Sequence, residues 1–412
     1  MEFLKDATKK KQFIMTYAVF LANGMLALSI GSLLPFIRDQ RGLDYAFCGL
    51  IVSLHSVGNL ISGFLAGALP MAIGRKKSIL LFELFFPLSF LIILLGGNRF
   101  LLAFAFFATG LARGASSNYC NTKINSIATG VAWVLNGLHA MFAVGAFVFP
   151  LLLMLITKDT GTMWVYACGF LMVLGIITWV IYLLIPETDE KPLKQDVRQD
   201  SSSKDAAETS GSQKPDLLGF FKEPLFYICT GTLFFYLCAE QGVIGWMITY
   251  FKDTGLLPPN LAQVTASILW VMILCGRLTT AYASTKVKKE RLLPAMGFGI
   301  VFFFIVLILS RSTLPIVIGI MGFGFSMAGI YATTVSFAGE IIRRYSLAWS
   351  FILTTASLGS ILMPSVIGLI AENLSIATGM ATIAIVLVID MVLIFILSRY
   401  IGKRSYTPSP RN

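Results

Sequence analysis

Two side chains of opposite charge, Arg113 and Glu240, interrupt long apolar stretches of the sequence. Arg113 follows LLAFAFFATGLA, and Glu240 follows LFFYLCA. A guanidinium presents parallel donors that suit a carboxylate or a phosphate, so Arg113 favours an organic anion as ligand. A carboxylate held away from water can take up and release a proton when its surroundings change, which makes Glu240 a candidate for proton coupling. A structural ion pair between the two residues is the alternative interpretation of Arg113.

Polar side chains accompany both residues at helical spacing. Ser117 follows Arg113 by one turn, Tyr236 precedes Glu240 by one turn, and His55 and Asn59 form a similar stripe elsewhere. Such stripes are typical of a wet cavity wall, although ordinary contacts between helices also explain each residue singly. The remaining residues that we expect around the same site are Asn23, Asn136, His139, Gln241, Gln263, Trp270 and Tyr331.

Two further residues are secondary candidates for proton coupling. His55 can change its charge near neutral pH, but it can equally serve as a hydrogen-bonding group between helices. Asp390 lies in the last apolar stretch, where a structural pairing near the headgroups is the favoured interpretation. Arg277 follows Gly276 near the end of another apolar stretch, so we expect it to snorkel or to grip neighbouring helix ends as a gating residue.

The elements that must position these residues are membrane-spanning helices. Hydrophobic residues make up 56% of the 412 and charged residues 13%, too few polar groups to cover a soluble surface. The apolar residues form twelve blocks of about twenty, the length that crosses a bilayer as a helix. The blocks are residues 13–36, 45–70, 78–97, 100–121, 132–156, 163–185, 224–250, 261–282, 292–310, 313–337, 346–370 and 376–398.

The charges between the blocks predict the orientation. Lys and Arg are frequent in alternate breaks and scarce in the opposite ones, so the positive-inside rule places both termini and the central loop in the cytoplasm. The net charge of +11 is therefore a signal of topology and lipid contact, and we do not expect nucleic acid as a partner. The first block is too long for a signal peptide, and we expect it to stay in the mature protein.

The chain divides into two halves that resemble each other. Residues 186–218 are rich in Ser, Lys, Asp and Glu, and they predict a cytoplasmic linker between an N-terminal six-helix bundle, 1–185, and a C-terminal one, 219–412. A single offset of 214 residues relates Gly110 to Gly324, Gly145 to Gly359, and Pro150 to Pro364. Small residues and helix-weakening prolines in matching places favour halves that rock on one another, so Pro150 and Pro364 are candidate gating residues.

The sequence lacks the usual signatures of an enzyme. It has two histidines, six cysteines without a CxxC pair, no phosphate-binding loop and no soluble domain of a size to hold ATP. We therefore expect no catalytic residues, no cofactor, no metal and no disulfide framework. An ion gradient or solute exchange must then drive any transport.

One loop resembles a family motif. GFLAGALPMAIGRKK, at Gly63 to Lys77, is similar to the loop motif of the major facilitator superfamily, with Met71 where that motif usually has an acid. The resemblance implies an all-α membrane protein of twelve transmembrane helices in two pseudo-symmetric six-helix bundles. It also implies conformational roles for Gly67, Gly74, Arg75 and Lys76.

Three segments resemble the fucose/proton symporter group of that superfamily. They are GLARGASSNYCN from Gly110, LNGLHAMFAVGAFVFP from Leu135 and FFYLCAEQGVIGWMITYF from Phe234. Sugar symporters of this group often carry an acid at the position of Ser117, so the solute need not be the same. We expect a monomeric carrier in the plasma (inner) membrane that moves an organic anion or a sugar by alternating access, coupled to protons. A drug or lipid exporter of the same fold, or a receptor that does not transport, is the alternative.

Overall fold

The chain folds entirely into helices and turns in the part that the structure describes. The computed structural model describes residues 5–128, 132–157, 162–186, 218–345 and 347–406. The first seven helices are α1 (Ala7–Arg41), α2 (Tyr45–Ile73), α3 (Arg75–Glu83), α4 (Phe85–Leu95), α5 (Arg99–Ile127), α6 (Ala132–Thr157) and α7 (Trp164–Leu184). After the short η2 (Gly219–Lys222) come α8 (Pro224–Thr254), α9 (Pro259–Ala283), α10 (Lys289–Leu309), α11 (Thr313–Met327), α12 (Ile330–Arg344), α13 (Ala348–Asn373) and α14 (Ile376–Tyr406).

Twelve of the described segments are long and apolar enough to cross a membrane, which confirms the predicted number of spans. The helices α3 and α4 together make one span, and α11 and α12 together make another. The first break has a plain cause. Pro87 has no N–H to donate to the carbonyl of Glu83, four residues earlier, so the helix is interrupted at Leu84. Most of the predicted linker, residues 187–217, lies outside the described residues.

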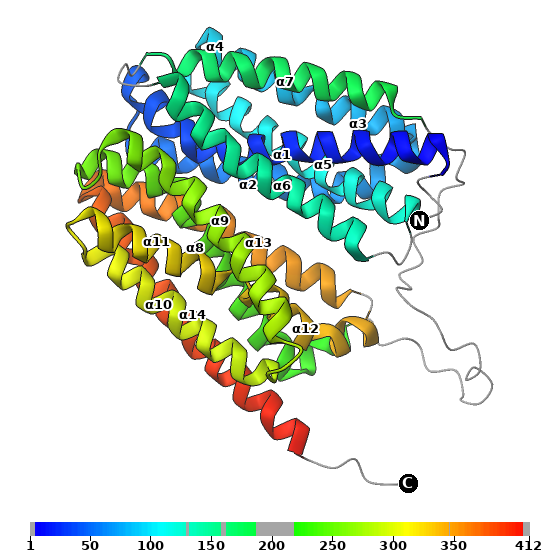
Figure 1. Ribbon diagram of the computed structural model, residues 1–412, viewed down its shortest axis with the longest axis vertical. Helices are drawn as coiled ribbons and strands as arrows, with labels where there is room; N and C mark the ends of the chain where they lie inside the picture. Colours follow the sequence, from blue (N-terminus) through cyan, green and yellow to red (C-terminus); the bar gives the residue numbers. More distant parts are fainter. Residues whose placement is uncertain (1–4, 129–131, 158–161, 187–217, 346, 407–412) are drawn as a thin grey trace.

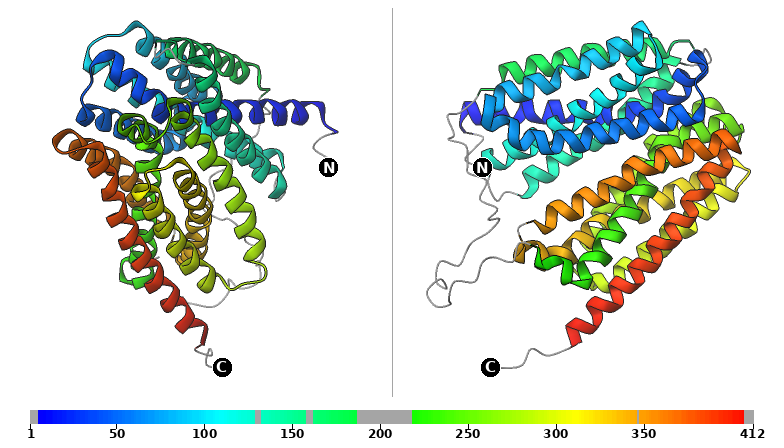
Figure 2. Two further views of the ribbon diagram at one scale, coloured as in Figure 1. Left: turned by 60° about the vertical axis from the view of Figure 1, so that its left-hand side comes forward. Right: turned by 180° about the vertical axis from the view of Figure 1, so that it is seen from behind.

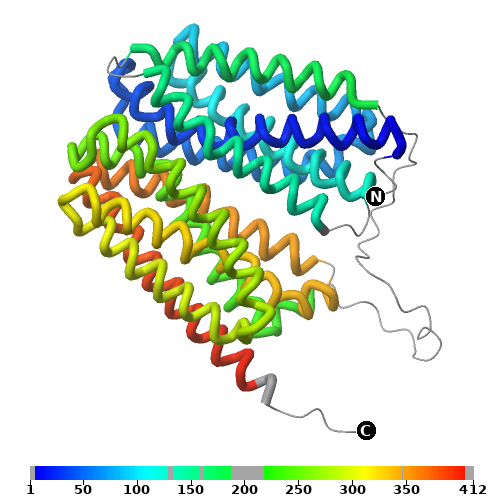
Figure 3. Tube along the Cα trace, in the orientation of Figure 1, coloured from blue at the N-terminus to red at the C-terminus, as the bar shows by residue number. Residues whose placement is uncertain are grey.

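The spans form two six-helix bundles. Figure 1 shows α1–α7 above and α8–α14 below, and the reverse view in Figure 2 shows the same separation. The bundles meet through α1 and α8, α2 and α13, and α6 and α9. In the tube trace of Figure 3 they come together where α1 ends and α2 begins, and they diverge toward the end that carries both chain termini.

The two bundles repeat each other's close contacts. A Cβ on Gly110 of α5 would collide with the α2 backbone, and one on its repeat mate Gly324 of α11 would collide with the α9 backbone. In the same way Gly145 of α6 touches α1, and Gly359 of α13 touches α8. Backbones approach this closely only where the side chain is absent, so the glycines fix matching helix pairs in the two bundles.

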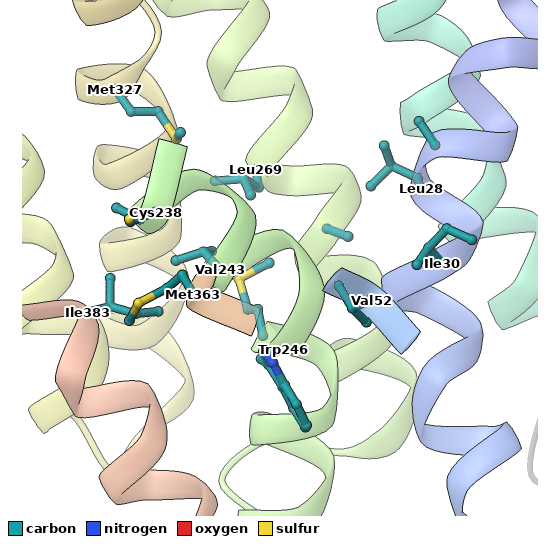
Figure 4. Packing of buried hydrophobic residues seen from close by; sticks show 14 of the residues in the cluster. Leu28, Ile30, Val52, Cys238, Val243, Trp246, Leu269, Met327, Met363 and Ile383 are labelled. Carbon is teal, nitrogen blue, oxygen red and sulfur yellow. The ribbon is translucent and has the colours of Figure 1, made fainter. Parts of the chain in front are cut away.

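The interface between the bundles is tight at one end. Gly31 of α1 lies against the Ile244 carbonyl of α8, and Gly49 of α2 lies against Pro364 of α13. Val52 of α2 packs close to α8, next to the segment that carries Trp246 (Figure 4). Small residues at each crossing let the helices meet directly, so the bundles are in close contact at this end.

Two hydrogen bonds reinforce these crossings. The Ser53 and Ser365 hydroxyls lie 2.8 Å apart between α2 and α13. The Ser267 hydroxyl of α9 donates to the Phe147 carbonyl of α6 at 2.8 Å. A polar side chain in an apolar span is favourable where it finds such a partner, so these serines join the bundles without charge.

Asp44 begins α2, outside the spans. Its Oδ1 accepts from the Phe47 N–H at 2.6 Å, and its Oδ2 lies 2.8 Å from the Arg99 guanidinium. The backbone N–H of Phe47, and then the charge of Arg99, hold the pKa of this carboxyl below its ordinary value. Asp44→Ala is expected to cost about 1 kcal/mol of unfolding free energy through loss of the cap.

Asp44→Asn isolates the contribution of the carboxylate charge to this stabilisation, because asparagine keeps an oxygen that can cap the helix. The folded-state pKa is lowered, so the contribution of the charge is present above the unfolded pKa of about 3.9. It is lost as the pH falls through the folded pKa. Thermal unfolding of wild type and Asp44→Asn in detergent should therefore differ at neutral pH and converge in acid. A difference that does not change with pH contradicts this assignment.

Candidate solute cavity

A cavity of about 710 Å³ lies between the two bundles. Helices α1, α2, α5 and α6 line it from one bundle, and α8, α9 and α12 line it from the other. This volume is in the range of small-molecule sites. A cavity that both bundles line changes shape whenever one bundle moves against the other, which is the arrangement a carrier requires.

The cavity is closed at one end and open at the other. Its lining includes Gly31, Val52 and Gly245, which are buried where the bundles meet. It also includes Asn136 and Arg277, which are exposed toward the end of the molecule with the chain termini. The structure therefore represents a conformation in which the cavity is accessible from that end.

Most of the polar residues predicted around the site line this cavity. The lining residues among them are His55, Asn59, Arg113, Ser117, Asn136, His139, Glu240, Gln241, Trp270 and Tyr331. They come from both bundles and from positions up to 276 residues apart in the chain (331 − 55). Helical periodicity predicted which face of each helix is polar, and the fold brings those faces together.

Three of the predicted residues lie behind the wall instead. Asn23 donates from Nδ2 to the Arg113 carbonyl at 3.1 Å and so ties α1 to α5. The Tyr236 hydroxyl donates to Glu240 Oε1 at 3.1 Å, one layer behind the surface. Gln263 is buried, and its Nε2 has no hydrogen-bond partner among the described residues. None of the three lines the cavity in this conformation, and their role in binding a solute stays a prediction.

Arg113 and Glu240 enter the cavity from opposite bundles. Among the described residues, neither forms an ion pair, although the charge of each acts on the other. The Arg113 guanidinium lies 6.0 Å from the centre of the Phe142 ring, whose face attracts a cation. The structure therefore places Arg113 without the direct acid partner that the structural alternative requires.

His55 presents one ring nitrogen toward its own bundle. Its Nδ1 lies 2.8 Å from the Thr109 hydroxyl, which donates its hydrogen to the Phe106 carbonyl at 2.6 Å. With the Thr109 hydrogen on the Phe106 carbonyl, the Thr109 oxygen accepts from Nδ1–H, because a hydroxyl has one hydrogen. A neutral His55 ring then keeps Nε2 as an acceptor, a suitable partner for a solute hydroxyl.

Two buried acids lie outside the cavity. Asp390 of α14 is fully buried, and neither carboxyl oxygen has a hydrogen-bond partner among the described residues, so the structural pairing favoured for it is absent from this conformation. Glu83 of α3 accepts from the Thr178 hydroxyl at 2.7 Å. Sequence reasoning overlooked Glu83, although an acid inside the apolar run FELFF is the same signal that identified Glu240.

The predicted gating residues have different surroundings. Gly74 adopts a φ of 87° at the start of α3, and the Lys76 ammonium donates to the Ile185 carbonyl at 2.6 Å, which ties α3 to the end of α7. A Cβ on Gly67 would meet nothing, so close packing does not explain this glycine. Arg75 follows Gly74, and Pro150 lies inside α6. Their roles in gating stay predictions.

Four charges join the bundles at the closed end. Arg38 of α1 pairs with Asp253 of α8, and Lys252 pairs with Asp39 at 2.8 Å. The Tyr45 hydroxyl also donates to Asp253 at 2.8 Å. The offset of 214 residues relates Arg38 to Lys252 and Asp39 to Asp253, so each bundle supplies one cation and one acid to this charge cluster.

Twelve spans in two bundles around a shared polar cavity define a polytopic membrane transporter. The chain belongs to the Major Facilitator Superfamily, whose family model matches residues 13–343. This confirms the family predicted from the loop motif.

Relatives and solved structures agree with this assignment. The chain is 22% identical to the glucose/mannose transporter GlcP of Bacillus subtilis over 91% of this chain and 92% of that protein. A bacterial homologue of the human lysosomal transporter Spinster, solved inward-facing and unoccupied, superposes with a TM-score of 0.80 at 14% identity, covering 98% of this chain and 100% of that one. A D-xylose-proton symporter gives 0.71 at 13% identity, covering 98% of each chain.

Proposed function

We propose that this protein is a secondary transporter that carries a small organic anion across the plasma membrane together with a proton. The observation that carries the proposal is the shared cavity, where Arg113 and Glu240 enter from opposite bundles without pairing. A guanidinium without an acid partner among the described residues can bind a carboxylate of the solute. A carboxylate that can change its solvation as the bundles move is a proton site.

Alternating access supplies the mechanism. By the positive-inside rule the chain termini are cytoplasmic, so the cavity described above opens to the cytoplasm. Rocking the bundles about the cavity would break the contacts at Gly31 and Gly49 and bring the exposed end together. A solute and a proton that both bind the cavity more strongly in one state than the other shift this equilibrium together.

A sugar is the second candidate solute. The acceptor Nε2 of His55, the amide of Asn59 and the ring of Trp270 offer the hydroxyl partners and stacking surface that a sugar needs. The relative GlcP is named as a glucose/mannose transporter, and a structural neighbour is a D-xylose-proton symporter. An exporter of drugs or lipids would favour a more apolar cavity that opens to the bilayer, and a receptor would need no charged groups in a cavity.

Proteoliposomes test coupling directly. The liposomes contain purified protein, and the outside medium is more acidic than the lumen. Wild type should then accumulate radiolabelled 4-hydroxybenzoate or D-glucuronate. For one proton per solute, the ratio of inside to outside concentration should rise up to about tenfold per pH unit. Glu240→Gln should lose this accumulation and keep exchange of labelled for unlabelled solute, because the solute still crosses. Glu83→Gln, which removes a buried acid outside the cavity, is the matched control and should accumulate as wild type does.

Three outcomes decide between the candidates. Accumulation of D-glucose without either acid favours the sugar carrier. If Glu240→Gln still accumulates the acid in response to the pH gradient, Glu240 does not couple the proton to the solute. Absence of any pH-driven uptake or exchange contradicts the proposed function.

A further inference from the structure

Arg277 lies in the wall of the cavity and faces water at its open end. It belongs to α9, lines the cavity and is exposed. Its neighbour Gly276 lies against the Phe325 carbonyl of α11, so α9 is fixed on the other side by a close backbone contact. The position is therefore a defined part of the C-terminal bundle, and the guanidinium is presented to the cavity and not to the lipid headgroups.

Arg277 is not held by an ion pair to any described acid. Among the described residues it forms no ion pair and no hydrogen bond with another side chain. The titratable group of the N-terminal bundle on which its charge acts is His139. A gate at this end would need an acid across from Arg277. His139 is not an acid, so it offers Arg277 no ion pair when the bundles close.

The cavity has more positive than negative charge. Its lining contains two arginines, Arg113 and Arg277, and one acid, Glu240, beside two histidines. With the histidines neutral the net charge is +1, from two cations and one anion. Cations partly removed from water are unfavourable unless an anion accompanies them. The protein supplies one such anion for two cations, and an anionic solute that enters the cavity would supply the second.

We infer that Arg277 is a second anion-binding residue, which holds the carboxylate of the solute together with Arg113 and is released for this role when Glu240 takes up a proton. The inference rests on the proposed function, because it names how that site selects its solute. The solute class is a monocarboxylate with a ring. The aromatic side chains that would pack on the ring are Phe20 and Phe142 from one bundle and Trp270 and Tyr331 from the other.

The link to the proton follows from the charges around Glu240. The titratable groups that act on it are Arg277 from α9, Arg113 from α5, and Tyr236 from its own helix, and it acts in turn on Tyr331 from α12. While Glu240 is ionised, its charge offsets that of the two arginines. When a proton from the water at the open end neutralises Glu240, both arginines can interact with the solute. Proton and anion then favour each other's binding, because linkage is reciprocal.

The same charges oppose closure of a cavity without solute. Closing would bring Arg277 and Arg113 into a space with less water, where the repulsion between the two cations is stronger. A bound carboxylate removes much of this repulsion. The loaded carrier therefore crosses more readily than the unloaded one, which is a requirement of coupled transport.

Binding measurements on the purified full-length protein test the inference. The probes are 4-hydroxybenzoate and D-glucuronate, with 4-hydroxybenzyl alcohol and D-glucose as uncharged counterparts, titrated by calorimetry at mildly acidic and mildly basic pH. Arg277→Gln should weaken binding of the acid by roughly 10- to 100-fold, the usual effect of losing a charge-assisted hydrogen bond. It should also flatten the pH dependence. Arg277→Lys should recover part of the affinity, and Arg291→Gln, at an exposed arginine of α10, should change nothing.

The outcomes separate this inference from the proposed function. If wild type binds an acid and Arg277→Gln binds it equally well with the same pH dependence, Arg277 has no role and the proposed function stands. If wild type binds only the uncharged probes, or none, the organic anion is wrong and the inference fails with it. Equal unfolding temperatures of wild type and Arg277→Gln exclude misfolding as the cause of lost binding. If Arg277→Gln unfolds at a lower temperature than wild type, the affinity of Arg277→Lys decides. An affinity of Arg277→Lys for the acid as low as that of Arg277→Gln contradicts the inference.

Discussion

Replacing Arg113 by Gln is expected to abolish carboxylate uptake, with a loss of about 100-fold or more in the initial rate, the scale of losing a desolvated charge partner. Gln has similar length and keeps hydrogen-bonding capacity but removes the charge. Arg113 forms no ion pair among the described residues, so this change breaks none, and Arg277 still offsets the charge of Glu240. The side chain is also not needed to join α1 and α5, because Asn23 bonds the backbone carbonyl of Arg113.

Uptake of 4-hydroxybenzoate and D-glucuronate into proteoliposomes is the measurement. Arg113→Lys should retain part of the rate, since an ammonium supplies charge without the planar pair of donors. Asn121→Ala is the control on the same helix, because Asn121 bonds back to the Ser117 carbonyl and does not line the cavity. If Arg113→Gln transports acids normally, or if D-glucose uptake falls equally, Arg113 is a structural residue.

The number and length of the spans could be predicted because hydrocarbon thickness sets them. Each apolar block corresponds to one described span, and the helices extend a few residues further at several ends, as α1 does to Arg41. The interruptions at Leu84 and at Ala328 were not predicted. Pro87 was a readable signal for the first, since its missing N–H acts four residues upstream. The second depends on packing around Gly329, which sequence alone does not reveal.

The candidate site could be predicted in part. Polar residues in apolar helices must face protein or water, so Arg113, Glu240 and His55 were found by type and period. Periodicity shows which side chains face away from lipid, but it does not show whether such a side chain contacts water or a neighbouring helix. Gln263 therefore was assigned to the cavity although it is buried behind the wall.

Arg277 was predicted to snorkel or to grip neighbouring helix ends as a gating residue, from its place near the end of an apolar block. Distance along a helix fixes depth and not direction. The fold presents its guanidinium to the cavity. The charge cluster at the closed end was also overlooked, although the offset of 214 residues already related Arg38 to Lys252 and Asp39 to Asp253.

Reversing one charge of that cluster should open the closed end. Arg38 and Asp253 are both shielded, with side-chain exposures of 15% and 12%, so their pairing is stronger than that of a surface pair. Arg38→Asp places an acid beside Asp39 and Asp253 and replaces attraction by repulsion. We expect the conformational equilibrium to shift by roughly 2–5 kcal/mol, the cost of disrupting a shielded charge pair.

Native Cys48 reports this shift. It is buried in α2 close to the charge cluster, so a membrane-impermeant maleimide should label it slowly in wild type and faster in Arg38→Asp. The same labelling measured in variants that also carry Cys48→Ser gives the contribution of the other cysteines. The double variant Arg38→Asp with Asp253→Arg restores opposite charges across the interface, although it loses the bond from Tyr45 to Asp253. Slow labelling should largely return. If the double variant is labelled as fast as Arg38→Asp, geometry and not charge holds this end closed, and the glycine contacts at Gly31 and Gly49 become the cause.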